Sequence, residues 1–349
     1  MSWLNDSDDE GEYSEYDESA VRVRPNPKAN KPRTKIRPEY ANAVIGRVFS
    51  VDRGRYGVWV DENTAASATS AGERQLIATK SRDLGKYSVV TGDRVDLVGD
   101  LSGDEGSLAR IVRVQPRETL LRRSADDTDA VERIIVANAD QMLIVVAAAN
   151  PEPRTRLVDR YLVAAFDAGI RPILCITKTD LQDPAEFLSS FAGLDLEVIE
   201  SRSDDFPVEH ITERLQGHTT VAVGHSGVGK STLVNALVPD ANRAVGRVND
   251  VTGRGRHTSS STVSLRIGTG WIVDTPGVRS FGLGHIDPSN ILRSFTDLAA
   301  LAEDCPRGCT HLPDAPDCAI IEGVAEGRLG TNGEQRLESF QRLIATLGS

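Results

Sequence analysis

The chain contains the run Gly224-His225-Ser226-Gly227-Val228-Gly229-Lys230-Ser231, followed by Thr232. The run matches the pattern G-x-x-x-x-G-K-[ST], and it lies between an apolar stretch at residues 220–223 and a helical pattern at residues 232–237. Glycines in such a loop let backbone N–H groups surround phosphate oxygens at the positive end of a helix. A glycine-rich turn formed by chance is the alternative, but the flanking strand and helix favour a phosphate-binding loop.

Within this loop, Lys230 is expected to reach the β- and γ-phosphates and to take part in catalysis, and the Ser231 hydroxyl is expected to bind Mg²⁺. A second motif, Asp274-Thr275-Pro276-Gly277, follows the apolar residues 271–273. We expect Asp274 to hold Mg²⁺ through water and the backbone of Gly277 to sense the γ-phosphate. The pattern D-x-x-G is weak alone, but its place at the end of a strand after a phosphate loop supports this interpretation.

A third motif indicates which base is bound. Thr177-Lys178-Thr179-Asp180 follows the apolar residues 172–176 and is similar to the guanine-recognition pattern N-K-x-D. Asp180 can accept hydrogen bonds from guanine N1–H and its exocyclic amine, which adenine does not offer, and the Lys178 stem can lie along the base. Thr177 departs from the usual asparagine. A surface turn is the alternative for such a tetrapeptide.

The order of the motifs is unusual. The guanine motif precedes the phosphate loop and D-x-x-G, and a strand ending near Ser201 stands where a second base-contacting loop belongs. Apolar stretches near residues 142–148, 173–177, 196–199, 220–223 and 271–273 alternate with helical patterns such as residues 154–168, which predicts a parallel α/β sheet. A cut between the third and fourth strands of a G domain, with the old ends joined, produces this order. The sequence therefore predicts a circularly permuted α/β P-loop GTPase domain that binds GTP or GDP.

Short alternating segments precede this domain and predict a five-stranded barrel, with an OB-fold favoured and an SH3-like barrel left open. The segments cover residues 44–49, 57–60, 75–78, 94–98 and 109–114. Basic residues run through them, with Tyr56 and Trp59 among them, which is typical of an RNA-binding face or of a solvated strand face. These basic residues are Arg47, Arg53, Arg55, Lys80, Arg82, Arg110 and Arg113.

The C-terminal part contains Cys305, Cys309, His311 and Cys318 in a loop rich in Pro and Gly. Three thiolates and one imidazole complete a tetrahedral site, so we expect one structural Zn²⁺. Helical patterns before and after this loop predict a helical zinc-binding domain. The expected division is a disordered charged tail at 1–40, the barrel at 41–118, the GTPase domain at 119–286 and the zinc-binding domain at 287–349.

The composition is that of a soluble protein, with 39% hydrophobic and 26% charged residues among 349. The net charge of −11 argues against a nucleic-acid partner, but residues 22–123 hold 20 Lys or Arg against 12 Asp or Glu. Local charge therefore says more about partners than the total does. The longest apolar run, residues 142–149, is too short to span a membrane. We expect a cytoplasmic protein that is a monomer and does not bind membranes.

The motif order, the flanking barrel and the cysteine-rich tail resemble the bacterial small-subunit-dependent GTPases of the RsgA/YjeQ type, over residues 41–349. The resemblance implies a GTPase that binds the small ribosomal subunit and its rRNA, assists late maturation of that subunit, and is stimulated by it. Gly255-Arg256-His257-Thr258 is among the matching pieces.

The catalytic water needs a partner that the second motif does not supply. Ras-type GTPases place a glutamine after D-x-x-G, and Val278 stands there in this chain. His257 is the nearest polar candidate for orienting the water, with a surface-loop histidine as the alternative. Thr258 is the expected catalytic switch ligand of Mg²⁺, with Ser259 as the alternative.

Two other functions compete with a GTPase. The first is a P-loop ATPase or kinase, which fails if Asp180 selects guanine. The second is an RNA-binding module whose nucleotide site only regulates affinity, an interpretation that Val278 supports and that the intact Lys230, Ser231 and Asp274 oppose.

Overall fold

The structure is a computed structural model that describes residues 40, 42–60, 74–124, 132–239, 262–275, 281, 283–284 and 286–348. The predicted tail at 1–40 lies almost entirely outside these residues. Within the described ranges, no helix combines the length and the apolar character needed to cross a membrane.

The first five strands form a closed barrel. Their order is β1-β2-β3-β5-β4, β1 also pairs with β4, and β3 pairs with β5 in parallel. This order and closure are those of an OB-fold, which settles the choice left open against an SH3-like barrel. Alternate residues of the strands point inward, so that Val48, Val58 and Leu97 lie fully buried in its core. The strands are β1 (Val44–Asp52), β2 (Arg55–Val60), β3 (Arg74–Lys80), β4 (Arg94–Gly99) and β5 (Ala109–Val114), with a 3-10 turn at Arg82–Leu84.

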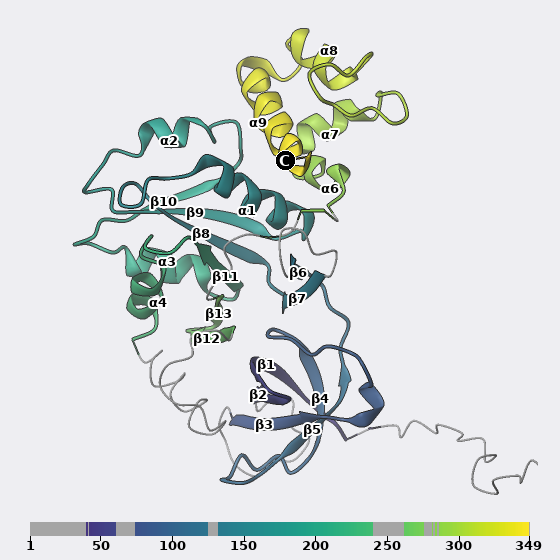
Figure 1. Cartoon of the computed structure of the whole chain (residues 1–349), viewed down its shortest axis with the longest axis vertical. Helices are drawn as coiled ribbons and strands as arrows, with labels where there is room; N and C mark the ends of the chain where they lie inside the picture. The colour runs from purple at the N-terminus through teal and green to yellow at the C-terminus, as the bar shows by residue number, and fades with distance from the viewer. Residues whose placement is uncertain are drawn as a thin grey trace, which may run out of the picture. The chain divides into compact units, whose positions relative to one another are not determined.

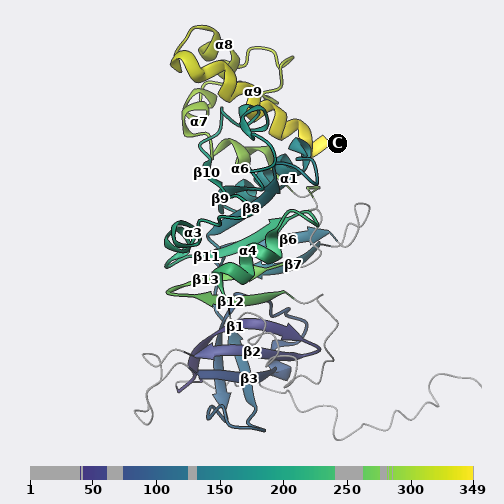
Figure 2. The ribbon, with the colours of Figure 1, turned by 90° about the vertical axis from the view of Figure 1, so that its left-hand side faces the viewer.

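A two-stranded hairpin, β6 (Leu120–Ser124) and β7 (Glu132–Ala137), leads into the GTPase domain. That domain has a sheet in the order β10-β9-β8-β11-β13-β12, parallel except for the β12–β13 hairpin (Figure 2). The chain passes from the edge strand β10 through α3 to the central strand β11, as the permuted order predicts. The strands are β8 (Gln141–Ala147), β9 (Arg171–Thr177), β10 (Glu197–Glu200), β11 (Thr219–Gly224), β12 (Val263–Ile267) and β13 (Gly270–Asp274).

Helices cover both faces of this sheet (Figure 1). Residues of β8 alternate between them: Met142 and Ile144 belong to the core on the α1 side, and Leu143 and Val145 belong to the core on the side of α3 and α4. This two-faced burial explains why β8 reads as a continuous apolar run. The helices are α1 (Thr155–Asp167), α2 (Ala185–Ser189), α3 (Val208–Leu215) and α4 (Lys230–Leu237).

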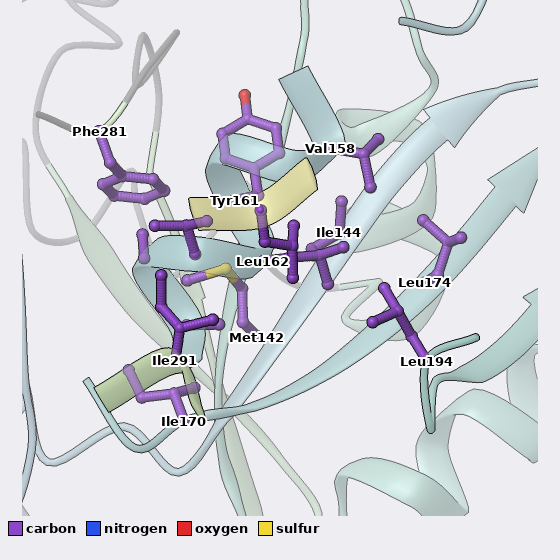
Figure 3. Packing of buried hydrophobic residues seen from close by; sticks show 14 of the residues in the cluster. Met142, Ile144, Val158, Tyr161, Leu162, Ile170, Leu174, Leu194, Phe281 and Ile291 are labelled. Carbon is purple, nitrogen blue, oxygen red and sulfur yellow. The ribbon is translucent and has the colours of Figure 1, made fainter. Parts of the chain in front are cut away.

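The C-terminal helices share the core on the α1 side, where Met142, Tyr161 and Leu162 meet Phe281 and Ile291 (Figure 3). The helical pattern predicted before the cysteine-containing loop proves to be two short helices, because the chain turns at residues 293–295 and Phe295 enters the core at 2% exposure. The elements are α6 (Pro288–Leu292), α7 (Thr296–Ala302), α8 (Ala319–Ala325) and α9 (Gly333–Ala345), with 3-10 turns at Gly330–Asn332 and Thr346–Gly348.

Candidate functional site

The phosphate loop joins β11 to α4, as the sequence predicts. Gly227 and Gly229 have φ of 85° and 92°, left-handed values that favour glycine, and α4 begins at Lys230. Gly224 has a different reason to be glycine: a Cβ there would lie 2.5 Å from the carbonyl oxygen of Val145 on the neighbouring strand. The loop therefore combines close strand packing with the turns that aim backbone N–H groups at an anion.

The side chains of the loop are divided between solvent and core. Ser226, Gly227, Ser231 and Thr232 are exposed. His225 is half-buried, and its Nδ1 lies 3.0 Å from the Ser226 carbonyl oxygen. Val228 is 3% exposed and packs among the residues under α4. The exposed members are those that a phosphate and its metal ion would meet.

Lys230 and Asp274 form an ion pair across the mouth of this loop. Their side chains are 12% and 29% exposed, so the two charges compensate each other in a half-buried place. The hydroxyl of Thr275 donates to the carbonyl of Ala222 at 2.9 Å, which holds the chain after β13 against β11. A bound phosphate can replace Asp274 as the ionic partner of Lys230, and a bound cation can replace Lys230 as the partner of Asp274.

The guanine motif lies directly against the phosphate loop. The Thr177 side chain is buried, and its hydroxyl lies 2.6 Å from the carbonyl oxygen of Val228 and 3.3 Å from that of Val146. A hydroxyl has one proton, so the shorter contact is the donated bond. Lys178 donates to the carbonyls of Gly227, at 2.9 Å, and Asn150. Two motifs that are about fifty residues apart in sequence therefore meet in space.

Asp180 stands at the outer end of this motif. Its carboxylate accepts a hydrogen bond of 2.6 Å from the Ser203 backbone N–H, which lowers the pKa of Asp180 and keeps it ionised as an acceptor. The carbonyl of Ser201 accepts from the Thr179 N–H at 3.2 Å, and the Ser201 side chain is buried. The predicted second base-contacting loop, near Ser201, thus supports the guanine motif through hydrogen bonds of its backbone. Leu181, which sequence reasoning missed, is 54% exposed beside it and offers an apolar surface to a base.

The four predicted metal ligands form one cluster. The ligand atoms of Cys305, Cys309, His311 and Cys318 all lie within 4.8 Å of one another. His311 Nδ1 is 3.7 Å from Cys305 Sγ and 3.6 Å from Cys318 Sγ, and the two sulfurs are 3.9 Å apart. Tetrahedral zinc, with Zn–S of about 2.3 Å and Zn–N of about 2.0–2.1 Å, requires ligand separations of about 3.6–3.8 Å. The cluster therefore fits a metal ion of that size.

The protonation states of His311 and Cys318 affect metal binding in opposite directions. Burial lowers the pKa of His311, which keeps the imidazole neutral and able to bind a cation. Burial also raises the pKa of the Cys318 thiol to about 11, so an entering cation must displace its proton. Gln341 on α9 donates to the His311 carbonyl at 2.9 Å and fixes the position of the loop.

Comparisons with known proteins agree with this geometry. The profile of the RsgA GTPase family matches residues 114–284. A small ribosomal subunit biogenesis GTPase RsgA of Pseudomonas syringae pv. syringae is 38% identical over 269 residues, covering 74% of this chain and 75% of that protein. The chain belongs to the RsgA GTPase family. A second RsgA, of Pseudomonas syringae pv. tomato, is 38% identical over 292 residues and covers 78% of this chain and 82% of that protein.

Solved structures show the same fold. YjeQ from Thermotoga maritima superposes with a TM-score of 0.63 at 25% identity, covering 88% of this chain and 99% of that one. YloQ, described as a circularly permuted GTPase, has a TM-score of 0.61 at 24% identity, covering 88% and 97%. The predicted fold, an OB-like barrel followed by a permuted GTPase domain, is confirmed. As a member of the RsgA family, the chain is a GTP-hydrolysing enzyme.

Three predicted site residues cannot be placed in this RsgA-family member. His257, Thr258 and Gly277 lie outside the described residues, as does the alternative ligand Ser259. Their roles stay predictions.

Two arginines of α9 connect the C-terminal helices to the GTPase domain, and no sequence pattern points to them. Arg336 pairs with Asp297 of α7 and, at 3.2 Å, with Asp195 beyond α2. Arg342 pairs with the buried Asp159 of α1 at 3.1 Å. Burial raises the pKa of Asp159, and Arg342 opposes this. Because Gln341 of the same helix holds the His311 loop, α9 connects the Cys/His cluster to α1.

The barrel's basic face differs from the sequence-based expectation. Tyr56 is buried in the barrel core, and Trp59 packs against Trp271 with ring centroids 5.9 Å apart. Arg47 lies in the same contact, with its guanidinium 5.3 Å from the Trp271 ring centroid. The Lys80 ammonium donates to two backbone carbonyls. The other basic residues of the predicted set are exposed, and Arg113 lies 3.5 Å from Asp96. They are Arg53, Arg55, Arg82, Arg110 and Arg113.

Proposed function

We propose that this GTP-hydrolysing enzyme binds GTP and GDP between the guanine motif and the phosphate loop. The observation that supports this most strongly is the direct contact of the two motifs, with Thr177 bonded to the Val228 carbonyl and Lys178 to the Gly227 carbonyl. A purine nucleotide whose phosphates lie on the loop then has its base beside Asp180. That carboxylate accepts hydrogen bonds, which selects guanine over adenine.

The chain's own residues supply most of what hydrolysis needs. Lys230 leaves Asp274 and binds the β- and γ-phosphates, and the backbone N–H groups of the loop surround them. The Ser231 hydroxyl and the Asp274 carboxylate offer the oxygen ligands that Mg²⁺ prefers, so these residues fit the ion. Bound Mg²⁺ would neutralise charge on the phosphate oxygens. We assign Thr258 as the switch ligand and His257 as the residue that orients water in place of a glutamine at Val278.

A competition assay tests the choice of base. Unlabelled GDP should displace a fluorescent guanine nucleotide, and ATP at the same concentration should not. Equal displacement by GDP and ATP would show that Asp180 does not select guanine, and the ATPase interpretation would replace this one.

We propose Zn²⁺ as the ion in the Cys305, Cys309, His311 and Cys318 cluster, with a structural role. All four ligands come from protein, and three thiolates with one imidazole favour Zn²⁺ over harder cations. The site has no free position for a substrate. The proposed domain division remains 1–40, 41–118, 119–286 and 287–349, with the zinc site in the last domain.

We propose that the partner is the small ribosomal subunit and that the protein assists its late maturation as a cytoplasmic monomer. The relatives are named for small-subunit biogenesis, and the barrel carries exposed Arg53, Arg55 and Arg110. Because Tyr56 is buried and Trp59 packs against Trp271, contact with rRNA would depend on charge and not on base stacking. Binding to rRNA should therefore weaken as the salt concentration rises.

Sedimentation with purified small subunits tests the partner. The protein should co-sediment with the subunits more strongly in its complex with a nonhydrolysable GTP analogue than in its complex with GDP. The amount that co-sediments should fall as the salt concentration is raised. Arg53→Glu with Arg55→Glu should weaken binding. Loss of co-sedimentation in every nucleotide state would contradict the ribosomal role and leave the GTPase assignment intact.

A further inference from the structure

Arg47 on barrel strand β1 contacts two strands of the GTPase domain at the same level. Its guanidinium donates to the Thr219 hydroxyl at 2.6 Å and lies over the Trp271 ring. Thr219 and Trp271 are partners in register near the starts of the parallel strands β11 and β13. One barrel side chain therefore touches both members of a cross-strand pair.

Other contacts hold the β12–β13 hairpin, to which Trp271 belongs, against the barrel. Ser50 of β1 pairs with Val263 of β12, and the Thr91 hydroxyl lies 3.3 Å from the Thr262 carbonyl oxygen. Trp59 meets Trp271 edge to face. The β12–β13 hairpin is thus fixed along its outer strand by backbone pairing and at Trp271 by side chains.

The opposite ends of β11 and β13 carry the nucleotide site. Ala222 is in register with Asp274, and the phosphate loop starts at Gly224. Asp274 is three positions after Trp271, which is about 10 Å along a strand. At that end Asp274 is paired with Lys230, and this pair must open when a phosphate binds Lys230.

We propose that Arg47 is a positioning residue for the nucleotide site: from the barrel it holds β11 and β13 in register and couples the nucleotide state to the barrel. The inference rests on the proposed binding of GTP and GDP at the phosphate loop. A ligand shifts a structure only through contacts that differ between states. Lys230 would meet the β- and γ-phosphates of GTP but only the β-phosphate of GDP, so the contacts that replace the Lys230–Asp274 pair differ between the two complexes. Coupling is reciprocal, so the state of the barrel also affects the nucleotide site.

The contacts of Arg47 and Trp59 with Thr219 and Trp271 form the junction between the barrel and the GTPase domain. Tryptophan emission reports on this junction directly. The chain has three tryptophans, Trp3, Trp59 and Trp271, and Trp3 lies outside the described residues. In a Trp3→Phe protein all tryptophan emission comes from Trp59 and Trp271. The emission of this protein should differ between its complexes with GDP and with a nonhydrolysable GTP analogue.

Variants of the junction locate the coupling. Arg47→Ala should lose the emission difference and change the ratio of the affinities for the analogue and GDP by about fivefold, at the lower end of typical coupling. Arg47→Lys keeps a cation near the Trp271 ring and should restore part of both effects. Arg266→Ala is the matched control, because Arg266 lies 5.7 Å from the same ring centroid but belongs to β12. It should keep both.

Each outcome of these measurements either supports or overturns the inference. If the Trp3→Phe protein binds both nucleotides with the same emission, the coupling is absent and the inference is overturned, whether or not the Arg47 variants fold. Arg47→Ala with an unchanged affinity ratio overturns it as well. If neither nucleotide binds, the proposed function fails and this inference fails with it, so the two failures are distinguishable.

Discussion

Thr177→Val removes one hydroxyl and leaves a side chain of nearly the same shape. Thr177 is 2% exposed, and its hydroxyl lies 2.6 Å from the Val228 carbonyl oxygen. The substitution leaves that carbonyl without this donor in a buried place. Losing one partner of a buried hydrogen bond costs about 1–3 kcal/mol.

The cost is divided between folding and binding. If the guanine motif stays against the phosphate loop, the free energy of unfolding falls by the whole amount. If the motif moves away so that the carbonyl meets water, binding must bring Lys178 and Asp180 back, and the cost appears as weaker nucleotide binding. The sum of the two changes should be about 1–3 kcal/mol, and each 1.4 kcal/mol that appears in binding raises Kd tenfold.

Calorimetric titration with GDP and urea unfolding of the nucleotide-free protein measure the two parts. Thr177→Ser keeps the hydroxyl and is the control, with GDP affinity close to that of the parent. The account of the Thr177 contact would be refuted if the valine variant matched the parent in both GDP affinity and free energy of unfolding.

Four further outcomes are expected. Asp180→Asn should shift preference from guanine to xanthine nucleotides, measured by competition, because an amide donates where guanine needs an acceptor. Freshly purified protein should contain one zinc ion per chain by elemental analysis, and Cys309→Ser should lose it; a zinc-free parent would end that assignment. His257→Ala should slow hydrolysis with GTP affinity kept within a few-fold, and unchanged stimulated turnover would make His257 an ordinary loop residue. Burial alone would raise the pKa of Asp297, but hydrogen bonds from Arg336 and the Leu298 N–H hold it below its usual value. The stability this contributes is present above the unfolded pKa of about 3.9 and is lost as pH falls through the lower folded pKa, so an acid-unfolding curve should lose this component in Arg336→Gln.

The sequence predicts well those helices and strands whose burial follows from the pattern of apolar residues within the element itself. β8 is buried on both faces and reads as an unbroken apolar run, and the strand–loop–helix context of residues 220–237 is contained in neighbouring residues. β12 is not among the predicted strands, although its residues VSLRI alternate between apolar and polar, a signal that could have identified it. The β6–β7 hairpin and α8 are not predicted either, because such short elements carry little periodic signal.

The roles of several side chains depend on contacts that local sequence does not contain. Thr177 reads as a departure from asparagine, and only the fold shows that its hydroxyl reaches the phosphate loop. Trp59 and Arg47 fit an exposed basic face by alternation, yet both are used where the barrel meets Trp271. Such contacts arise from docking of segments that are about fifty residues apart for Thr177 and more than a hundred apart for Arg47 and Trp59. Pattern within a short window of sequence cannot predict them.

The central claim is a GTPase that works with the small ribosomal subunit, and steady-state GTP turnover with and without purified small subunits tests it most directly. Without a glutamine after D-x-x-G the isolated protein should turn over slowly. At low salt the subunits should raise turnover by at least about tenfold, a change of about 1.4 kcal/mol in the barrier. Unchanged turnover under these conditions would contradict the ribosomal role.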